Sequence, residues 1–192
     1  MWTPIDKRSD NVAAQDAPDL SEQTRTLIRD LLACYPTHRS ALLPALRLAQ
    51  DQVGYLPPKT LLQVSELLGL PPTEVLDAAS FYEMFWLKPK GRKLIQVCES
   101  FACELCGQID LLGALEKKLG IKPGETTPDG QFTLITVQCL AACDKGPVVM
   151  VNDMLFERVS PQKLDELLAA NVAPISHETL VRAIELHKQP RG

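Results

Sequence analysis

The chain has 192 residues, a formal net charge of −4, and 45% hydrophobic and 23% charged residues. This is the composition of an ordinary globular protein with enough apolar residues for a core in one domain or two modest ones. The acidic balance argues against nucleic-acid binding, which needs a basic face. No run of about 18 apolar residues is present, so we expect no direct membrane insertion. The N-terminus has no apolar signal region, and we expect a cytoplasmic protein.

Helical patterns dominate the first half of the chain. Residues 1–20 are polar and aperiodic, which predicts a flexible N-terminal tail. Apolar residues then recur at helical spacing, which predicts helices over residues 21–35, 40–53 and 58–68 and from about residue 73 into 81–86. Ser21 is the expected N-cap of the first helix, and Gly54 and Gly69 are the expected C-caps of the next two. We therefore predict a helical bundle over residues 21–88.

The pattern changes after Lys88-Pro89-Lys90-Gly91. Strands are predicted at residues 94–97 and 132–137, and a hairpin over 148–151 and 154–159. Helices are predicted at residues 107–119 and from Ser160-Pro161 to about residue 170. This order predicts a four-stranded mixed sheet with helices packed on it over residues 89–172, and an α+β protein overall. Residues 173–192, with a short helix near 176–187, form a predicted C-terminal extension.

Two cysteine pairs, Cys98-x4-Cys103 and Cys139-x3-Cys143, each follow a predicted strand. Soft thiolate ligands select iron–sulfur clusters, zinc or Cu(I), and clustered cysteines in a reducing cytosol favour metal ligands over disulfides. Cys34 lies on the apolar side of the first predicted helix, where a buried structural cysteine is expected.

Cys106 leaves two other schemes open. Together with Cys98 and Cys103 it gives C-x4-C-x2-C, the opening of the plant-type ferredoxin spacing. Cys103 and Cys106 alone form a C-x-x-C, which is typical of thiol–disulfide exchange. Neither scheme accounts for the pairing of Cys139 with Cys143, so we favour Cys98, Cys103, Cys139 and Cys143 as the ligand set.

The spacing by itself does not separate an iron–sulfur cluster from zinc, since both accept cysteines two to four residues apart. A Rieske centre is excluded because it needs two histidines, and none lies between His38 and His177. No G-x-G-x-x-G, P-loop or Ser-His-Asp pattern is present, so we predict no catalytic residues and expect a component of a larger assembly.

The motifs around these cysteines resemble those of the E subunits of bacterial NADH-quinone oxidoreductase, respiratory complex I. The resemblance covers about residues 22–170 and rests on Val97-Cys98-x4-Cys103-x3-Gly107 and on the stretch from Cys139 to Pro147. Further similar segments are Gly54-Tyr55-Leu56-Pro57, Ala79-Ser80-Phe81-Tyr82, the run from Leu115 to Gly124 and the run from Asp129 to Leu134.

This resemblance implies a helical N-terminal part followed by a thioredoxin-like domain with one [2Fe–2S] cluster on Cys98, Cys103, Cys139 and Cys143. It implies one-electron exchange with FMN in a flavin- and NADH-binding partner subunit. The other expected partners are the peripheral-arm iron–sulfur subunits, on the cytoplasmic face of the inner membrane. Two departures stand out: Ala141 occupies a position where the family commonly has glycine, and Cys106 is not a family ligand.

Three questions stay open at this point. The same cysteine pattern occurs in subunits of NAD-linked formate dehydrogenases and bidirectional hydrogenases. A zinc-stapled interaction module is the alternative of another class. The aromatic segment with Phe81, Tyr82, Phe85 and Trp86 is expected either to pack internally or to form a docking surface.

Overall fold

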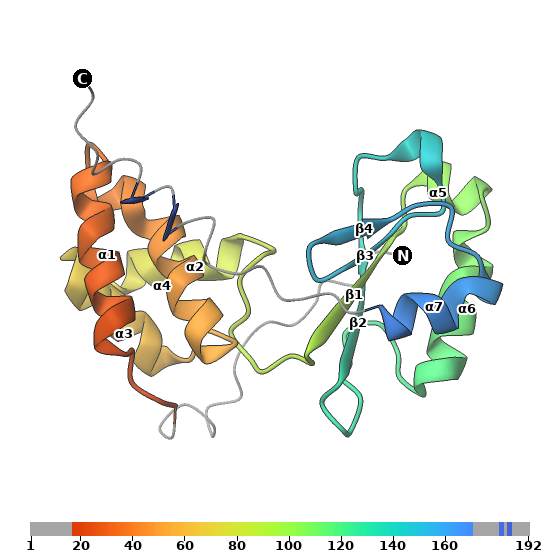
Figure 1. Ribbon diagram of the computed structural model, residues 1–192, viewed down its shortest axis with the longest axis horizontal. Helices are drawn as coiled ribbons and strands as arrows, with labels where there is room; N and C mark the ends of the chain where they lie inside the picture. Colours follow the sequence, from red (N-terminus) through yellow and green to blue (C-terminus); the bar gives the residue numbers. More distant parts are fainter. Residues whose placement is uncertain (1–16, 171–180, 183, 186–192) are drawn as a thin grey trace. The chain divides into compact units, whose positions relative to one another are not determined.

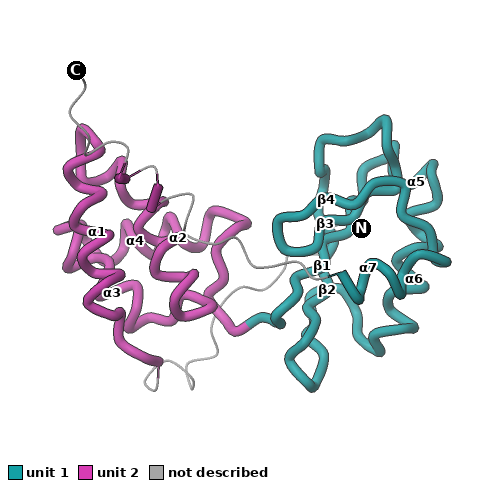
Figure 2. The backbone as a smooth tube through the Cα atoms, in the orientation of Figure 1, with its two compact units in different colours: residues 1–6, 90–175 teal, residues 7–89, 176–192 magenta. Residues whose placement is uncertain are grey.

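The computed structural model describes residues 17–170, 181, 182, 184 and 185. It contains two compact units (Figure 2). The helical unit comprises residues 7–89 and 176–192, and the sheet unit comprises residues 1–6 and 90–175. Most of the predicted tail and C-terminal extension lies outside the described residues. Of the parts that are described, Ala17 and Leu20 are buried, and Ile184 belongs to the core of the helical unit.

Four α-helices and one 3₁₀ turn form the helical unit (Figure 1). They are α1 (Glu22–Cys34), η1 (His38–Ala41), α2 (Leu42–Val53), α3 (Pro58–Leu68) and α4 (Pro72–Phe81). The predicted caps are confirmed, because the Ser21 side chain accepts a hydrogen bond from the backbone N–H of Thr24. Gly54 and Gly69 end α2 and α3 in the left-handed conformation that glycine adopts without penalty.

One buried glutamine ties the segment after α4 to α2. Gln50 Nε2 donates to the carbonyl of Met84 at 2.9 Å, and the backbone N–H of Trp86 donates to Gln50 Oε1 at 2.7 Å. Pairing these backbone groups allows the segment to be buried, since an unpaired group would cost about 1–3 kcal/mol. Phe85 is therefore fully buried, whereas Phe81 is 79% exposed. The aromatic segment thus divides between internal packing and the surface.

The sheet unit is built on a four-stranded mixed sheet in the order β2-β1-β3-β4. Its strands are β1 (Lys93–Cys98), β2 (Phe132–Val137), β3 (Val149–Val151) and β4 (Met154–Phe156). β1 pairs with β2 in parallel, whereas β1 with β3 and β3 with β4 are antiparallel. The predicted mixed sheet and hairpin are confirmed, with shorter β3 and β4 strands than the sequence indicated.

The helices of the sheet unit complete its core. They are α5 (Phe101–Leu105), α6 (Gln108–Leu119) and α7 (Leu164–Ala169), joined by the 3₁₀ turns η2 (Cys143–Lys145) and η3 (Pro161–Lys163). Ile95 and Val97, two residues apart on β1, point to one face and pack in the same core as Leu111 of α6 and Leu164 of α7. Figure 1 shows α6 and α7 beside the sheet. Within the described residues, no helix is long and apolar enough to cross a membrane.

Candidate iron–sulfur site

The parallel pairing of β1 and β2 brings the two cysteine pairs to one edge of the sheet. Cys98 is the last residue of β1 and lies in register with Val137, the last residue of β2. Parallel strands end at the same edge, so Cys139, two residues past β2, emerges beside Cys98. The backbone N–H of Glu99 donates to the Val137 carbonyl at 2.9 Å and holds the two strand ends together.

The first cysteine pair is buried. After Cys98 the chain turns at Ser100 into the five-residue helix α5, which the sequence did not predict and which carries Cys103. Cys98 and Cys103 are 2% and 1% exposed and pack in an apolar cluster with Val148. A hydrogen bond joins the two thiols, and the backbone N–H of Cys98 donates to the Val148 carbonyl at 3.1 Å. The pair therefore sits on the inner side of the site.

The second pair is exposed to solvent. Cys139 and Cys143, the first residue of η2, are both exposed and hydrogen-bonded to each other. Ala141 between them adopts a left-handed conformation with φ +58°. Its backbone N–H donates to Cys139 Sγ at 3.3 Å. The loop thus folds tightly around its own sulfur atom.

Contacts between the two loops connect the pairs. Leu140 and Ala142 of the second loop pack against the apolar cluster of Cys98 and Cys103. The backbone N–H of Leu140 donates to the Cys98 sulfur. Cys143 in turn lies close enough to Cys98 for the two thiols to interact electrostatically. All four predicted ligands are therefore brought together from two loops.

The proton affinities of the thiols reflect these contacts. Burial opposes ionisation of Cys98, but hydrogen bonds from Ser100, Leu140 and Cys103 outweigh it and lower the pKa of Cys98 below its ordinary value. Burial raises the pKa of Cys103. The hydrogen bond and negative charge of Cys139, followed by burial, raise the pKa of Cys143. Thiolates packed this closely repel each other, and a bound cation would relieve that repulsion.

Cys106 and Cys34 occupy different surroundings. Cys106 is exposed at the C-terminal end of α5, with its side chain beside Gly146. A Cβ atom added to Gly146 would lie 3.2 Å from Cys106 Sγ, so this thiol faces the backbone after η2. Cys34 lies in α1, partly buried against the core of the helical unit, in keeping with a structural role. All six cysteines are free thiols.

The donor set fits a two-iron cluster. A [2Fe–2S] cluster is held by four cysteine thiolates, which are shared between its two irons. Within residues 17–170 and the four described residues beyond them, no group of three or more His, Cys, Asp or Glu side chains is arranged around one point as a single-ion site. Two linked pairs meet the requirement of a two-iron cluster, because neither iron needs three protein ligands.

Sequence reasoning missed the groups that surround the sulfur atoms. Ser100 Oγ lies 3.4 Å from Cys98 Sγ, and the N–H groups of Leu140 and Ala141 point at ligand sulfurs. A hydroxyl residue two positions after a cysteine is a usable signal for the first. The backbone donors depend on the loop conformation, which the residue types do not specify.

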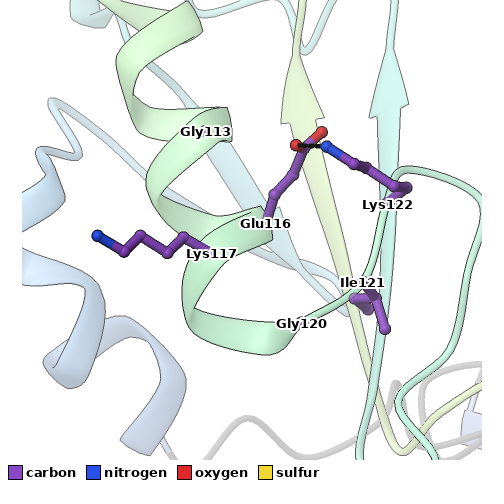
Figure 3. Close-up of a pocket in the computed structure, with 6 residues that line it drawn as sticks. All are labelled: Gly113, Glu116, Lys117, Gly120, Ile121 and Lys122. Carbon is purple, nitrogen blue, oxygen red and sulfur yellow. Dashed lines mark hydrogen bonds and ion pairs between the residues drawn. The ribbon is translucent and has the colours of Figure 1, made fainter.

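A shallow pocket elsewhere on the sheet unit lies away from the cysteines (Figure 3). It has a volume of about 260 Å³ and lies around the C-terminal end of α6, lined by Gly113, Glu116, Lys117, Gly120, Ile121 and Lys122. An ion pair between Lys122 and Glu116 closes one side. The cysteine loops adjoin the opposite, N-terminal end of the same helix.

Comparisons with known proteins agree with this geometry. The thioredoxin-like [2Fe-2S] ferredoxin family matches residues 28–171. An E subunit of NADH-quinone oxidoreductase from Rhizobium meliloti, the one numbered 2, is 45% identical over 75% of this chain and 86% of its own length. The corresponding E subunits of Aquifex aeolicus and Escherichia coli are 41% and 38% identical, over 79% and 80% of this chain and 94% and 92% of theirs.

A solved structure of an NAD⁺-reducing [NiFe]-hydrogenase also shares the fold. It superposes with a TM-score of 0.60 and 26% identity over 78% of this chain. The chain spans 24% of that hydrogenase chain, so the likeness concerns one segment of a longer protein. The match over 28–171 includes all four site cysteines, and the relatives at 38–45% identity match over most of their own length. The chain therefore belongs to the thioredoxin-like [2Fe–2S] ferredoxin family, whose cofactor is one [2Fe–2S] cluster.

Proposed function

We propose that this chain is an electron-transfer subunit in the NADH-oxidising module of a bacterial respiratory NADH:quinone oxidoreductase. In this proposal Cys98, Cys103, Cys139 and Cys143 hold the cluster, and one electron at a time is exchanged with FMN in a partner subunit that also binds NADH. The observation that carries the proposal is the convergence of these four thiols at one edge of the sheet. The near full-length similarity to E subunits supports the assignment to this complex.

The residues of the site have separate tasks. When bound, a [2Fe–2S] cluster supplies a centre that gains and loses one electron. The buried pair Cys98 and Cys103 fixes one side within the apolar core of the unit. The N–H groups of Leu140 and Ala141 donate to sulfur, which stabilises additional negative charge there. The exposed pair Cys139 and Cys143 leaves a route by which an electron can reach a partner.

The proposal divides the chemistry between subunits. NADH delivers two electrons as hydride, whereas an iron–sulfur centre accepts one, so a flavin is needed to separate them. The flavin and NADH sites are assigned to the partner, with the chain held peripherally on the cytoplasmic face of the membrane as part of the complex. The purified chain alone should therefore not reduce an electron acceptor with NADH.

The first experiment measures the cofactor. The purified chain should be reddish-brown, contain two irons per chain, bleach with dithionite and then give a [2Fe–2S] paramagnetic resonance signal. A colourless protein with stoichiometric zinc would instead establish the zinc-stapled module and refute electron transfer.

A second experiment tests the ligand set. Cys139→Ala and Cys143→Ala should each impair or abolish cluster binding, because each removes a thiolate ligand. Cys106→Ala and Cys34→Ala are matched controls that should keep the native iron content. A cluster that is lost in Cys106→Ala but kept in Cys139→Ala or Cys143→Ala would establish the plant-type ligand arrangement.

The likeness to an NAD⁺-reducing hydrogenase supports a second candidate of the same class. In that case the same site would serve a hydrogenase, or an NAD-linked formate dehydrogenase, rather than a quinone reductase. Purifying the chain with its native partners decides between them. NADH-dependent quinone reduction supports the respiratory complex, and hydrogen- or formate-dependent NAD⁺ reduction supports the alternatives.

A further inference from the structure

The short helix α5 exposes large apolar side chains beside a buried ligand. Phe101 and Leu105 are 74% and 72% exposed, whereas Cys103 between them is 1% exposed. Residues four apart in a helix lie on the same side, so Phe101 and Leu105 form one apolar surface. Burying a Phe or Leu side chain is normally favourable, and an exposed group of them beside a functional site is typical of an interaction surface.

This apolar surface is continuous with the exposed part of the cysteine site. Cys106 at the end of α5 faces Gly146, just after η2, so α5 lies against the loop that carries Cys139 and Cys143. Figure 1 shows α5 and this loop together at one end of the sheet. Ile109, in the first turn of α6, is also exposed. We call Phe101, Leu105, Ile109, Cys139 and Cys143 the cysteine-end face.

Acidic side chains surround this face. Glu104, Asp110 and Asp144 are all exposed, on α5, α6 and η2. Lys145 and Arg158 bring positive charge to its border, but Lys145 is held by Glu157 at 2.7 Å. An apolar centre with a mainly acidic rim is complementary to a partner that presents an apolar patch among basic side chains.

Electron transfer explains why a partner should sit here. Transfer rates fall steeply with distance, so a redox partner must approach the side on which the ligands are exposed. Cys139 and Cys143 are exposed, whereas Cys98 and Cys103 are buried. A protein that covers the exposed thiols at close range also covers Phe101 and Leu105.

We propose that the cysteine-end face is the docking surface for the flavin- and NADH-binding subunit, which contacts Phe101, Leu105 and Ile109 through an apolar patch bordered by basic residues. This inference rests on the proposed function and adds to it the surface through which the electron passes.

The test compares two charge substitutions of equal size in the cluster-loaded full-length chain. Phe101→Glu/Leu105→Glu places two carboxylates in the apolar centre. Met154→Glu is the matched control, because Met154 is an exposed apolar residue of β4 in register with Val151, towards the end of the sheet opposite Cys98. The probe is the purified flavin-binding subunit from the same organism, and its dissociation constant is measured by biolayer interferometry. Iron content and the paramagnetic resonance signal of each variant are measured alongside.

The double variant should bind the flavin subunit at least about tenfold more weakly, as expected for central interface residues, with native iron content and signal. Met154→Glu should bind as the unaltered chain does. Binding of the unaltered chain should weaken as ionic strength rises, because the acidic rim contributes to attraction.

Three results would overturn the inference, and they separate it from the proposed function. Equal affinity of the double variant and the unaltered chain would reject the surface while leaving the electron-transfer role intact. Self-association of the unaltered chain that the double variant abolishes, seen by analytical ultracentrifugation, would assign the face to a second copy. No binding of the flavin subunit by the cluster-loaded unaltered chain would reject the proposed function, and the surface with it.

Discussion

Ala141 holds the second ligand loop in a conformation that favours glycine. Its φ of +58° puts the Cβ close to the backbone, and its N–H donates to the Cys139 sulfur. The related family commonly has glycine at this position. The loop therefore reaches the same kind of turn with alanine, at a conformational cost.

Ala141→Gly should stabilise the folded chain. Relief of the left-handed strain is worth about 1–2 kcal/mol, and the added freedom of the unfolded chain offsets about 0.4–1 kcal/mol of it. The net gain in the free energy of unfolding should be up to about 1 kcal/mol, measured by guanidinium unfolding of the cluster-loaded protein. The neighbouring Ala142→Gly is the control and should destabilise, since Ala142 has φ −126° and packs on the buried cysteine pair.

Gly91 allows the segment before β1 to approach β2. A Cβ on this residue would lie 2.6 Å from the backbone carbon of Phe132 and 2.9 Å from the nitrogen of Thr133. Gly91→Ala should therefore lower the free energy of unfolding by about 1–3 kcal/mol, the usual cost of overpacking. Urea unfolding followed by circular dichroism measures the loss.

Gly113→Ala is the matched control for that change. Gly113 lies inside α6 and a Cβ there meets no atom within 4 Å. Alanine should stabilise the helix by about 0.5–1 kcal/mol. Equal effects of the two substitutions would contradict the close approach at Gly91.

At the scale of elements, residue spacing predicted what depends on local chemistry. Ser21 at the start of α1 and Gly54 at the end of α2 have the expected cap geometries. The helix α5 was not predicted, because five residues are too few for a periodic pattern to be recognised. Its position depends on the packing of Cys103 against Val148, which is fixed by tertiary contacts.

The site itself was predictable in its ligands and not in its exposure. Spacing and resemblance selected the four cysteines, and the structure brings them together. That Cys98 and Cys103 are buried while Cys139 and Cys143 face solvent follows from the course of the two loops, which the sequence pattern does not encode. For the same reason, the separation of exposed Phe81 from buried Phe85 required the hydrogen bonds of Gln50.

An ion pair between η1 and α4 should make the stability of the helical unit depend on pH. Arg39 Nη2 donates to Glu74 Oε2 at 2.9 Å, and this hydrogen bond holds the pKa of Glu74 below its ordinary value. A lowered pKa contributes stability above the unfolded value of about 4.3 and loses it as the pH falls through the folded pKa. Glu74→Gln should therefore lower the melting temperature near neutral pH, and the difference from the unaltered chain should close in acid.

A double-mutant cycle tests whether Arg39 is the cause. In an Arg39→Gln background, Glu74→Gln should have a smaller effect at neutral pH, because its partner is already absent. Melting temperatures of the four proteins across the acid range give the coupling. An equal effect of Glu74→Gln in both backgrounds would assign the pH dependence to another group.

At the scale of the whole molecule, each unit has a hydrophobic core of its own. Leu46 and Val64 belong to the core of the helical unit, and Ile95 and Leu115 to that of the sheet unit. A ligand that binds only to the folded form of one unit stabilises that unit directly. Stability in this chain is therefore expected to be separable between the units.

Removing the cluster should loosen the sheet unit and leave the helical unit protected. Iron chelation under reducing conditions frees the four thiols, so local opening near Cys98 and in α5 becomes easier. Hydrogen–deuterium exchange followed by mass spectrometry should show faster exchange in peptides spanning the end of β1 and α5. Peptides from α2 and α3 should exchange as before, and equal acceleration there would contradict independent cores.

The parallel pairing of β1 and β2 has a consequence for how the protein is made. Translation delivers Cys98 and Cys103 well before Cys139 and Cys143, and α6 must be completed in between. A nascent chain that has emerged only as far as β2 carries two of the four thiols and cannot retain the cofactor. Maturation therefore begins after synthesis has passed η2, and the assembly machinery that delivers iron and sulfide meets the solvent-facing thiols first.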